Sequence, residues 1–260
     1  MKSQELIGIL EELSPVKYAL DWDNVGLLCG RREREVSTVY IALDATDEVV
    51  SAAVRQKADF LLTHHPLLFR AVKSVTEDDF IGRRLITLIR NDISYYAMHT
   101  NFDVMGMADA AAEVLGLRDT EVLDVTFEEE GSKEGIGRVG RLPRVFSVAE
   151  LCSYVKNRFN LEHARVYGDP ESNVEIAAIC PGSGKSEIRK ALKAGAEVLV
   201  TGDIEHHEGI DAVAEGLVII DAGHYGIEKL FIDYMKDYIS ENCKDLTILT
   251  HPLAEPFWIG

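Results

Sequence analysis

Residues 58–67 read ADFLLTHHPL, an apolar run that ends in two histidines and a proline. The run at 60–62 predicts a short buried strand, which Pro66 prevents from continuing. In open α/β sheets ligands bind just beyond the carboxyl ends of strands, so His64 and His65 are well placed to hold a metal ion. Because adjacent residues of an extended chain point to opposite sides, we expect them to serve two ions or two sides of one site. Considered alone, the pair fits two structural histidines equally well.

The sequence on either side of this strand predicts an α/β arrangement with parallel strands. The expected elements are strands at 39–43 and 93–98 and helices at 3–13, 47–57, 80–91 and 108–115, the first of them capped by Ser3. Parallel strands place Asp44, just after the first of these strands, at the same sheet edge as His64. Ligand-type side chains also follow the second strand, in the run HTNFD at 99–103.

The segment 19–28, ALDWDNVGLL, is polar and then apolar, which predicts a loop leading into a strand. Trp22 lies beside Asp23 and Asn24, and this group suits either a pocket wall or a turn. We prefer a turn that the Asx side chains stabilise, with the indole packed against the protein.

The composition predicts a soluble, cytoplasmic protein with one large or two modest domains. The chain has 260 residues and a net charge of −17, which argues against non-specific binding to nucleic acid or to anionic membranes. Its N-terminus lacks the apolar core of a signal peptide, and no apolar run approaches the length of a membrane span. The four cysteines form no CxxC pair, so they predict neither a disulfide framework nor a thiolate zinc site.

The sequence changes character near residue 124. The acidic run at 128–135 predicts a solvated loop or hairpin tip, because it lacks the alternating ligands of a calcium loop. Ser147 and Glu150 predict the start of a helix with a capping box. Short strands are expected at 164–167 and 174–180.

Two parts of the chain repeat each other. Segments 39–65 and 177–203 match without a gap, and both run strand, polar turn, helix, Ala-acid, apolar strand and Thr. His64 and His65 thereby correspond to Gly202 and Asp203. A His-x3-acid pattern also recurs, once as His99 with Asp103 and once as His224 with Glu228. These matches favour an internal duplication over a chance likeness of two βαβ units.

The duplication predicts an α/β fold of two related lobes. The strand-end ligands of the two lobes are then expected to converge.

The candidate ligands combine imidazole and carboxylate without thiolate, which is the donor set of zinc, iron or manganese sites. They are His64, His65, Asp103, His224 and Glu228, while His99, Asp44 and Asp203 stay open as further members. If Gly223 and His224 open a helix, His224 and Glu228 share one face of it. A carboxylate that bridges two metal ions roughly 3.5–4 Å apart suits the activation of water for hydrolysis.

Two other motifs point to chemistry that we reject. Residues 182–186, GSGKS, resemble the end of a P-loop, but Ile179 stands where that motif needs glycine. We expect a tight turn before a helix there, although such a turn also suits anion binding. Cys180 is expected to be a small buried core residue and not a nucleophile.

Several motifs together resemble the Nif-three-like family, the YbgI-type dinuclear metal-binding proteins also labelled GTP cyclohydrolase I type 2 homologues. The motifs are WDNVGLL (22–28), LLTHHPLLF (61–69), HTNFD (99–103), PGSGKS (181–186), TGDIEHHEGIDA (201–212) and DAGHYGIEKL (221–230). They extend over almost the whole chain and are specific as a set. The resemblance implies a toroidal homohexamer and a two-lobed α/β fold with mixed sheets flanked by helices, the second lobe inserted into the first. On that basis we place residues 1–125 and 222–260 in a metal-binding first lobe, and residues 126–221 in the inserted second lobe.

The resemblance also implies roles for individual residues. His64 and His65 look like ligands of different metal ions, Asp103 like a ligand of one ion, His224 of the other, and Glu228 like the bridge between them. Asp203, Glu205, His206 and His207 fall in a variable part of the family's TGD motif and look like substrate-side groups. We assign proton transfer to Glu205, His206 and His207.

Two classes of function follow from these expectations. The first is a metal-dependent hydrolase that acts on a nucleotide or a related heterocyclic or phosphorylated substrate, with two divalent transition-metal ions per chain. The second is a non-catalytic metal-binding ring that acts as a metal chaperone or as a regulatory protein. A nucleic-acid-binding ring is disfavoured by the net charge of −17.

Overall fold

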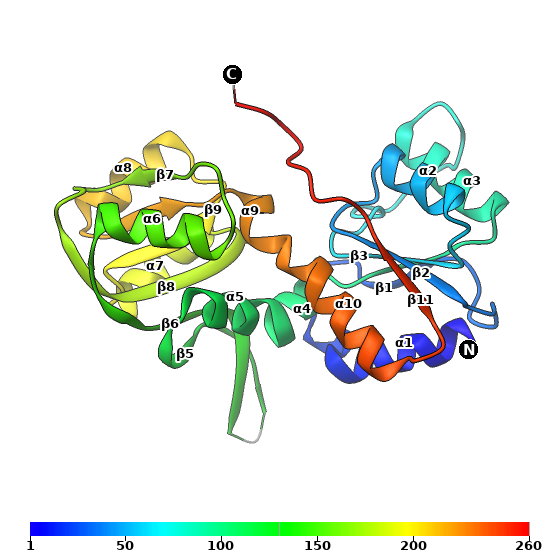
Figure 1. Cartoon of the computed structure of the whole chain (residues 1–260), viewed down its shortest axis with the longest axis horizontal. Coiled ribbons are helices and arrows are strands. Elements are labelled where there is room, and N and C mark those ends of the chain that lie inside the picture. Colours follow the sequence, from blue (N-terminus) through cyan, green and yellow to red (C-terminus); the bar gives the residue numbers. More distant parts are fainter. Residues whose placement is uncertain (130, 260) are drawn as a thin grey trace. The chain divides into compact units, whose positions relative to one another are not determined.

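The computed structural model describes residues 1–129 and 131–259, which form two compact units. Unit 1 comprises Met1–Phe102 and Phe231–Ala254, and unit 2 comprises Asp103–Leu230 and Glu255–Gly260. Each unit is built on a mixed sheet flanked by helices, which confirms the predicted fold class (Figure 1).

Unit 2 is longer at both ends than the second lobe predicted at 126–221. The helices α5 (Ala108–Leu115) and α9 (His224–Glu228) account for the difference, because Leu115 and Ile227 belong to the hydrophobic core of unit 2. The domain boundaries predicted from the sequence stay a prediction.

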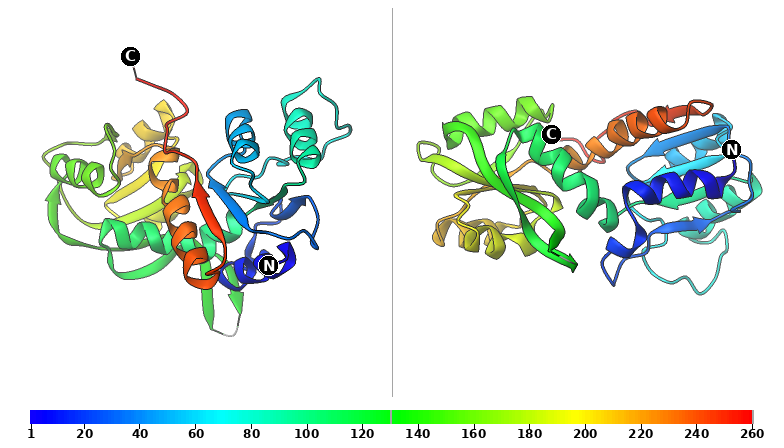
Figure 2. Two further views of the ribbon diagram at one scale, coloured as in Figure 1. Left: turned by 45° about the vertical axis from the view of Figure 1, so that its right-hand side comes forward. Right: turned by 90° about the horizontal axis from the view of Figure 1, so that it is seen from below.

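In unit 1 a mostly parallel sheet carries helices on both faces. The elements are α1 (Ser3–Leu13), the 3₁₀ turn η1 (Val16–Tyr18), β1 (Gly26–Cys29), β2 (Thr38–Ala42), α2 (Asp47–Arg55), β3 (Phe60–Thr63), α3 (Phe80–Arg90), β4 (Ser94–Ala97), α4 (Thr100–Phe102), α10 (Leu230–Asn242) and β11 (Thr247–Thr250). The strand order is β1-β4-β3-β2-β11, in which β1 runs antiparallel to β4 and the other pairs are parallel. Helices α2 and α3 cover one face of this sheet, and α1 and α10 cover the other (Figures 1 and 2).

The central strand β3 is buried on both faces, which explains its uninterrupted apolar sequence. Leu61 packs into the core beneath α2 and α3. Phe60 points to the opposite face, where its ring stacks on that of Tyr96 with the centroids 6.1 Å apart. In the parallel register Leu62 lies between Ile41 and Tyr96, so β2, β3 and β4 end at one edge of the sheet.

The helix starts show where local sequence rules hold and where they do not. The capping box of α6 (Val148–Arg158) is confirmed, because the Ser147 hydroxyl accepts from the Glu150 N–H and the Glu150 carboxylate accepts from the Ser147 N–H. The predicted Ser3 cap is wrong, since Lys2 holds the N-cap position of α1. The Ser3 hydroxyl instead donates to the Arg34 carbonyl oxygen at 3.2 Å.

In unit 2 the sheet order is β5-β6-β8-β9-β10-β7. Beside α5, α6 and α9, its elements are the π-helical turn η2 (Asp103–Met107), β5 (Arg118–Glu129), β6 (Ser132–Ser147), β7 (Arg165–Tyr167), β8 (Asn173–Ser183), the 3₁₀ turn η3 (Lys185–Glu187), α7 (Ile188–Lys193), β9 (Val198–Gly202), α8 (His206–Ala214) and β10 (Val218–Asp221). The right view of Figure 2 shows α5 and α6 on one face of the sheet and α7 and α8 on the other. Glu130, at the predicted hairpin tip, lies outside the described residues.

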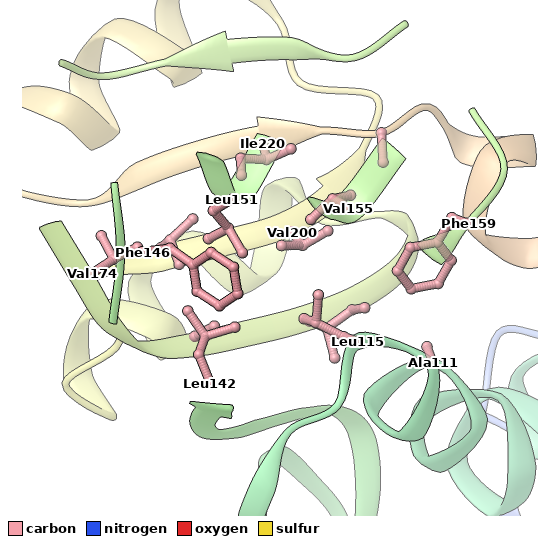
Figure 3. Close-up of a cluster of buried hydrophobic side chains, with 14 of the residues drawn as sticks. Ala111, Leu115, Leu142, Phe146, Leu151, Val155, Phe159, Val174, Val200 and Ile220 are labelled. Carbon is pink, nitrogen blue, oxygen red and sulfur yellow. The ribbon is translucent and has the colours of Figure 1, made fainter. Parts of the chain in front are cut away.

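One hydrophobic core of unit 2 lies between its sheet and the helices α5 and α6. Leu115, Leu151 and Val155 point from these helices onto Val200 and Ile220 of the sheet (Figure 3). All five side chains are fully buried. Burying side chains of this size stabilises a fold by roughly 1.5–3 kcal/mol each.

The two βαβ segments of the sequence repeat contain matching hydrogen bonds. In unit 1 the Asp59 carboxylate accepts from the backbone N–H groups of residues 37 and 38 at 2.8 and 3.0 Å. In unit 2 the matching residue, Glu197, accepts from those of residues 175 and 176 at 2.6 and 3.0 Å. In both units the acid before the second strand thus holds the start of the first strand, which supports duplication.

None of the helices in the described part of the chain is long and apolar enough to cross a membrane.

Candidate metal-binding site

The loop that follows β3 carries two of the three histidines that cluster in unit 1. His64, His65 and His99 each place one ring nitrogen within 4.8 Å of the others. The ring centroids of His64 and His65 lie 4.8 Å apart, and they lie 5.2 and 5.5 Å from that of His99. Successive side chains of an extended strand point to opposite sides, but β3 ends at Thr63. The rings of His64 and His65, which follow the strand, therefore need not point apart.

Each of the four candidate histidines forms a hydrogen bond from its ring nitrogen Nδ1 to a carbonyl or carboxylate oxygen. His64 bonds the Met98 carbonyl at 2.7 Å, His65 bonds Asp44 at 2.8 Å, His99 bonds Asp23 at 2.9 Å and, in unit 2, His224 bonds Asp203 at 2.7 Å. Since these oxygens accept hydrogen bonds, each ring carries a proton on Nδ1, and the neutral imidazole then has its lone pair on Nε2, where a metal ion binds. Metal-binding histidines have this arrangement, because the oxygen sets both the tautomer and the ring orientation.

Tyr95, buried in β4, holds the backbone of the loop after β3. Its hydroxyl oxygen accepts from the Leu67 N–H at 2.7 Å and lies 3.1 Å from the carbonyl oxygen of His65. Burial raises the pKa of Tyr95 to about 12, so the hydroxyl keeps the proton that it donates. Sequence reasoning missed this tyrosine, because its partners are remote along the chain.

Asp23 ties the loop at 19–24 to the histidine cluster. Its side chain is fully buried and accepts from His99 and from both the N–H and the hydroxyl of Thr100. Burial opposes the ionisation of Asp23, but the hydrogen bonds from His99 and Thr100 together outweigh it and lower its pKa to about 2. The sequence predicted a local turn here and missed the link to His99.

The replacement Asp23→Asn is expected to flatten the pH dependence of stability in acid. A carboxyl group whose pKa falls from 3.8 to about 2 on folding stabilises the folded chain above pH 4. That contribution, about 2 kcal/mol, is lost as the pH falls through 2. Urea unfolding of chelator-treated protein between pH 4 and pH 2 measures it, with Asp21→Asn in the same loop as the control. A variant as acid-sensitive as the wild type would contradict the role given to Asp23.

In unit 2, Glu228 lies close to two other ligand-type side chains, those of Asp103 and His224. His224 begins α9 and Glu228 lies one turn later, so His224 Nε2 comes within 2.9 Å of Glu228 Oε2, as the spacing predicted. One carboxylate oxygen of Asp103 and one of Glu228 lie within 4.8 Å of each other. Glu228 is buried and Asp103 is partly buried, and carboxylates this close repel each other. A cation relieves that repulsion, so the donor set fits a metal ion.

Gly182 has no side chain, and the Glu228 carboxylate occupies the space that a Cβ would fill. Its φ is +70°, and a Cβ at this position would lie 2.3 Å from Glu228 Oε1. The turn at 182–186 therefore faces a carboxylate, which argues further against a phosphate-binding loop. Cys180 is buried as expected, and burial, followed by the charge of Glu187, raises its pKa well above the usual value. A thiol in this state is a poor nucleophile.

The predicted catalytic groups lie at the start of α8 in unit 2. Glu205 holds the N-cap position, and its N–H donates to the Glu208 carboxylate at 3.1 Å. His206 and His207 are exposed, with their ring centroids 5.1 Å apart. Within the described residues, the clusters suited to a metal ion do not include these three side chains. Their part in catalysis stays a prediction.

Comparison with known sequences identifies relatives over almost the whole chain. Residues 1–255 match the family described as Duf34/NIF3 (NGG1p interacting factor 3). A Clostridium perfringens protein named GTP cyclohydrolase 1 type 2 homolog is 38% identical over 230 residues, which cover 88% of this chain and 87% of that protein. A Streptococcus pneumoniae protein of the same name is 33% identical over 248 residues, which cover 93% and 91%.

Solved structures share the fold. A Bacillus cereus protein related to NIF3 superposes with a TM-score of 0.90 at 25% identity, covering 100% of this chain and 99% of that one. Reduced HcgD from Methanocaldococcus jannaschii has a TM-score of 0.83 at 33% identity, covering 96% and 97%.

Proposed function

This chain belongs to the Duf34/NIF3 family, as its motifs predicted, and on that premise we propose that it is a metal-dependent hydrolase with two divalent transition-metal ions. The proposed ligands are His64, His65, Asp103, His224 and Glu228, of which Glu228 would bind both ions. Zinc, iron and manganese suit this mixture of imidazole and carboxylate. We further propose that the chain assembles as a homohexamer.

The hydrogen bond at Nδ1 of each histidine is the observation that carries this proposal. An oxygen acceptor holds the rings of His64, His65 and His224 in the tautomer that a metal ion requires. In unit 2 His224 Nε2 and Glu228 Oε2, two atoms of the kind that bind metal ions, lie only 2.9 Å apart. This pair is suited to a shared cation.

The residues of the chain have distinct tasks in the proposed reaction. Divalent ions held by these residues would supply an activated water and would polarise the group that this water attacks. Asp44 and Asp203 keep the protons of His65 and His224 on Nδ1, and Glu228 balances the positive charge of the ions. Glu205, His206 and His207 are proposed to pass protons to and from the substrate.

The proposed substrate is a nucleotide or a related heterocyclic or phosphorylated compound. The name GTP cyclohydrolase 1 type 2 homolog, which the relatives carry, supports the nucleotide class. The net charge of −17 does not oppose an anionic substrate, because bound cations reverse the field at the site.

Elemental analysis of protein purified without chelators tests the proposal. We expect about two transition-metal ions per chain, as in other two-metal hydrolases. His64→Ala removes a proposed ligand and is expected to lower metal affinity about tenfold or more. His99→Ala is expected to lower it less, because His99 is not among the proposed ligands. Equal losses in the two variants would make His99 a ligand and revise the set.

Two outcomes would change the proposed function. Protein that stays metal-free after incubation with zinc, iron and manganese would overturn it. Two bound ions without turnover of any nucleotide would favour a non-catalytic metal-binding ring, such as a metal chaperone or a regulatory protein.

A further inference from the structure

Two exposed aromatic rings lie next to each other on the loops beside the histidine cluster of unit 1. Trp22 is 57% exposed and Phe69 is 49% exposed. Their ring centroids lie 5.6 Å apart, with an angle of 53° between the planes. The expectation of a packed indole at Trp22 is therefore wrong. Large aromatic side chains usually bury most of their surface, and adjacent exposed ones mark places where a partner or ligand binds.

A third ring, that of His99, completes the group. Its centroid lies 5.9 Å from that of Trp22 and 6.2 Å from that of Phe69. The same imidazole also meets the rings of His64 and His65 at 5.2 and 5.5 Å. His99 thus joins the two exposed aromatic rings to the residues proposed to bind metal.

The two aromatic side chains are exposed, but their loops are anchored. The side chain of Asp23, the neighbour of Trp22, is buried and hydrogen-bonded to His99 and Thr100. Asn24 donates from its side-chain amide to the carbonyl oxygen of Leu68, which ties one loop to the other. A surface held in place before binding loses less entropy when a ligand arrives, so this arrangement favours recognition.

We propose that Trp22 and Phe69 bind the planar nitrogen heterocycle of the substrate, with His99 at the inner side of that ring. The inference rests on the proposed function and narrows its substrate class to compounds with such a ring. Because the two aromatic planes are inclined by 53°, a flat ligand stacks on one of them and meets the other with its edge. Stacking of this kind tolerates different bases, because every base has a π-face.

Trp22 fluorescence measures this binding in the full chain. The chain has two tryptophans, and Trp258→Phe, at an exposed position near the C-terminus, leaves Trp22 as the reporter. We expect guanosine to quench this fluorescence saturably, and we expect ribose, which lacks the base, to have no effect. Phe69→Ala is expected to raise the guanosine dissociation constant roughly 5- to 150-fold, the range for losing one stacking contact.

A matched variant controls for the loss of an exposed aromatic side chain. Phe80, at the start of α3, is 50% exposed, and its ring contacts Arg84. Phe80→Ala is expected to leave guanosine binding unchanged. Trp22→Ala, followed by calorimetry, is expected to weaken binding as much as Phe69→Ala does.

The outcomes separate this site from the proposed function. Equal weakening by Phe69→Ala and Phe80→Ala, or equal quenching by ribose and guanosine, would overturn the ring-binding site. Guanosine binding by a chain that takes up no metal would support the ring-binding site and defeat the hydrolase. Metal-dependent turnover of a nucleotide with the same KM in wild type and Phe69→Ala would defeat the ring-binding site alone.

Discussion

Replacing Glu228 by glutamine is expected to lower metal affinity and metal-dependent hydrolysis roughly 100-fold or more. Glutamine keeps the shape of the side chain but removes the negative charge that the proposed ions require. Glu228 is buried, 2.9 Å from the His224 ring and within 4.8 Å of an Asp103 oxygen. In the variant, a water molecule therefore has little room to take over the role of the lost carboxylate as a metal ligand. Elemental analysis and competition with a chromogenic chelator measure the change.

The stability of the metal-free protein separates this effect from misfolding. Without a metal ion, Glu228→Gln removes the repulsion between two close carboxylates, so the metal-free variant should be at least as stable as the metal-free wild type. Glu215→Gln, at an exposed position after α8, controls for the loss of one negative charge. Full metal content and unaltered hydrolysis in Glu228→Gln would refute the two-ion proposal.

Replacing Gly182 by alanine is expected to lower metal affinity at least tenfold while costing only about 1–2 kcal/mol of stability. The stability cost comes from the φ of +70°, which is unfavourable for any residue with a Cβ. The new Cβ would also lie 2.3 Å from Glu228 Oε1. That oxygen ends a flexible side chain, so it moves aside without unfolding the protein and leaves its metal-binding position.

Gly195→Ala is the matched control for Gly182→Ala. Gly195 has a φ of +78°, and a Cβ there would meet nothing within 4 Å. Both variants should therefore lose similar stability in urea unfolding, and only Gly182→Ala should lose metal affinity. The same metal affinity in both would mean that the contact between Gly182 and Glu228 is irrelevant to metal binding.

Most candidate ligands follow from short-range rules of sequence. Strands β3 and β10 end shortly before the candidate ligands, β3 before His64 and β10 before His224, because the apolar run of each strand stops at that point. The four-residue spacing of His224 and Glu228 places them on one turn of α9. Neither inference needs to know how distant segments meet.

The repeat predicted the same backbone in both units but not the same chemistry. Where unit 1 has His64, unit 2 has Gly202. A Cβ at Gly202 would lie only 2.5 Å from the backbone nitrogen of His224. The close approach of α9 to the end of β9 therefore requires glycine, and this requirement becomes visible only in the folded unit.

The sequence by itself determined the parallel βαβ pattern, the mixed sheets flanked by helices and the imidazole and carboxylate donors, because each depends on residues close together in the chain. Only the tertiary structure decided which oxygen atoms orient those donors. Asp23 reaches His99 across 76 residues, and the Met98 carbonyl reaches His64 across 34. Tertiary structure likewise left Trp22 and Phe69 exposed beside that cluster. Hydrogen bonds and ring contacts of this kind depend on how separate loops pack, and no local pattern encodes that packing.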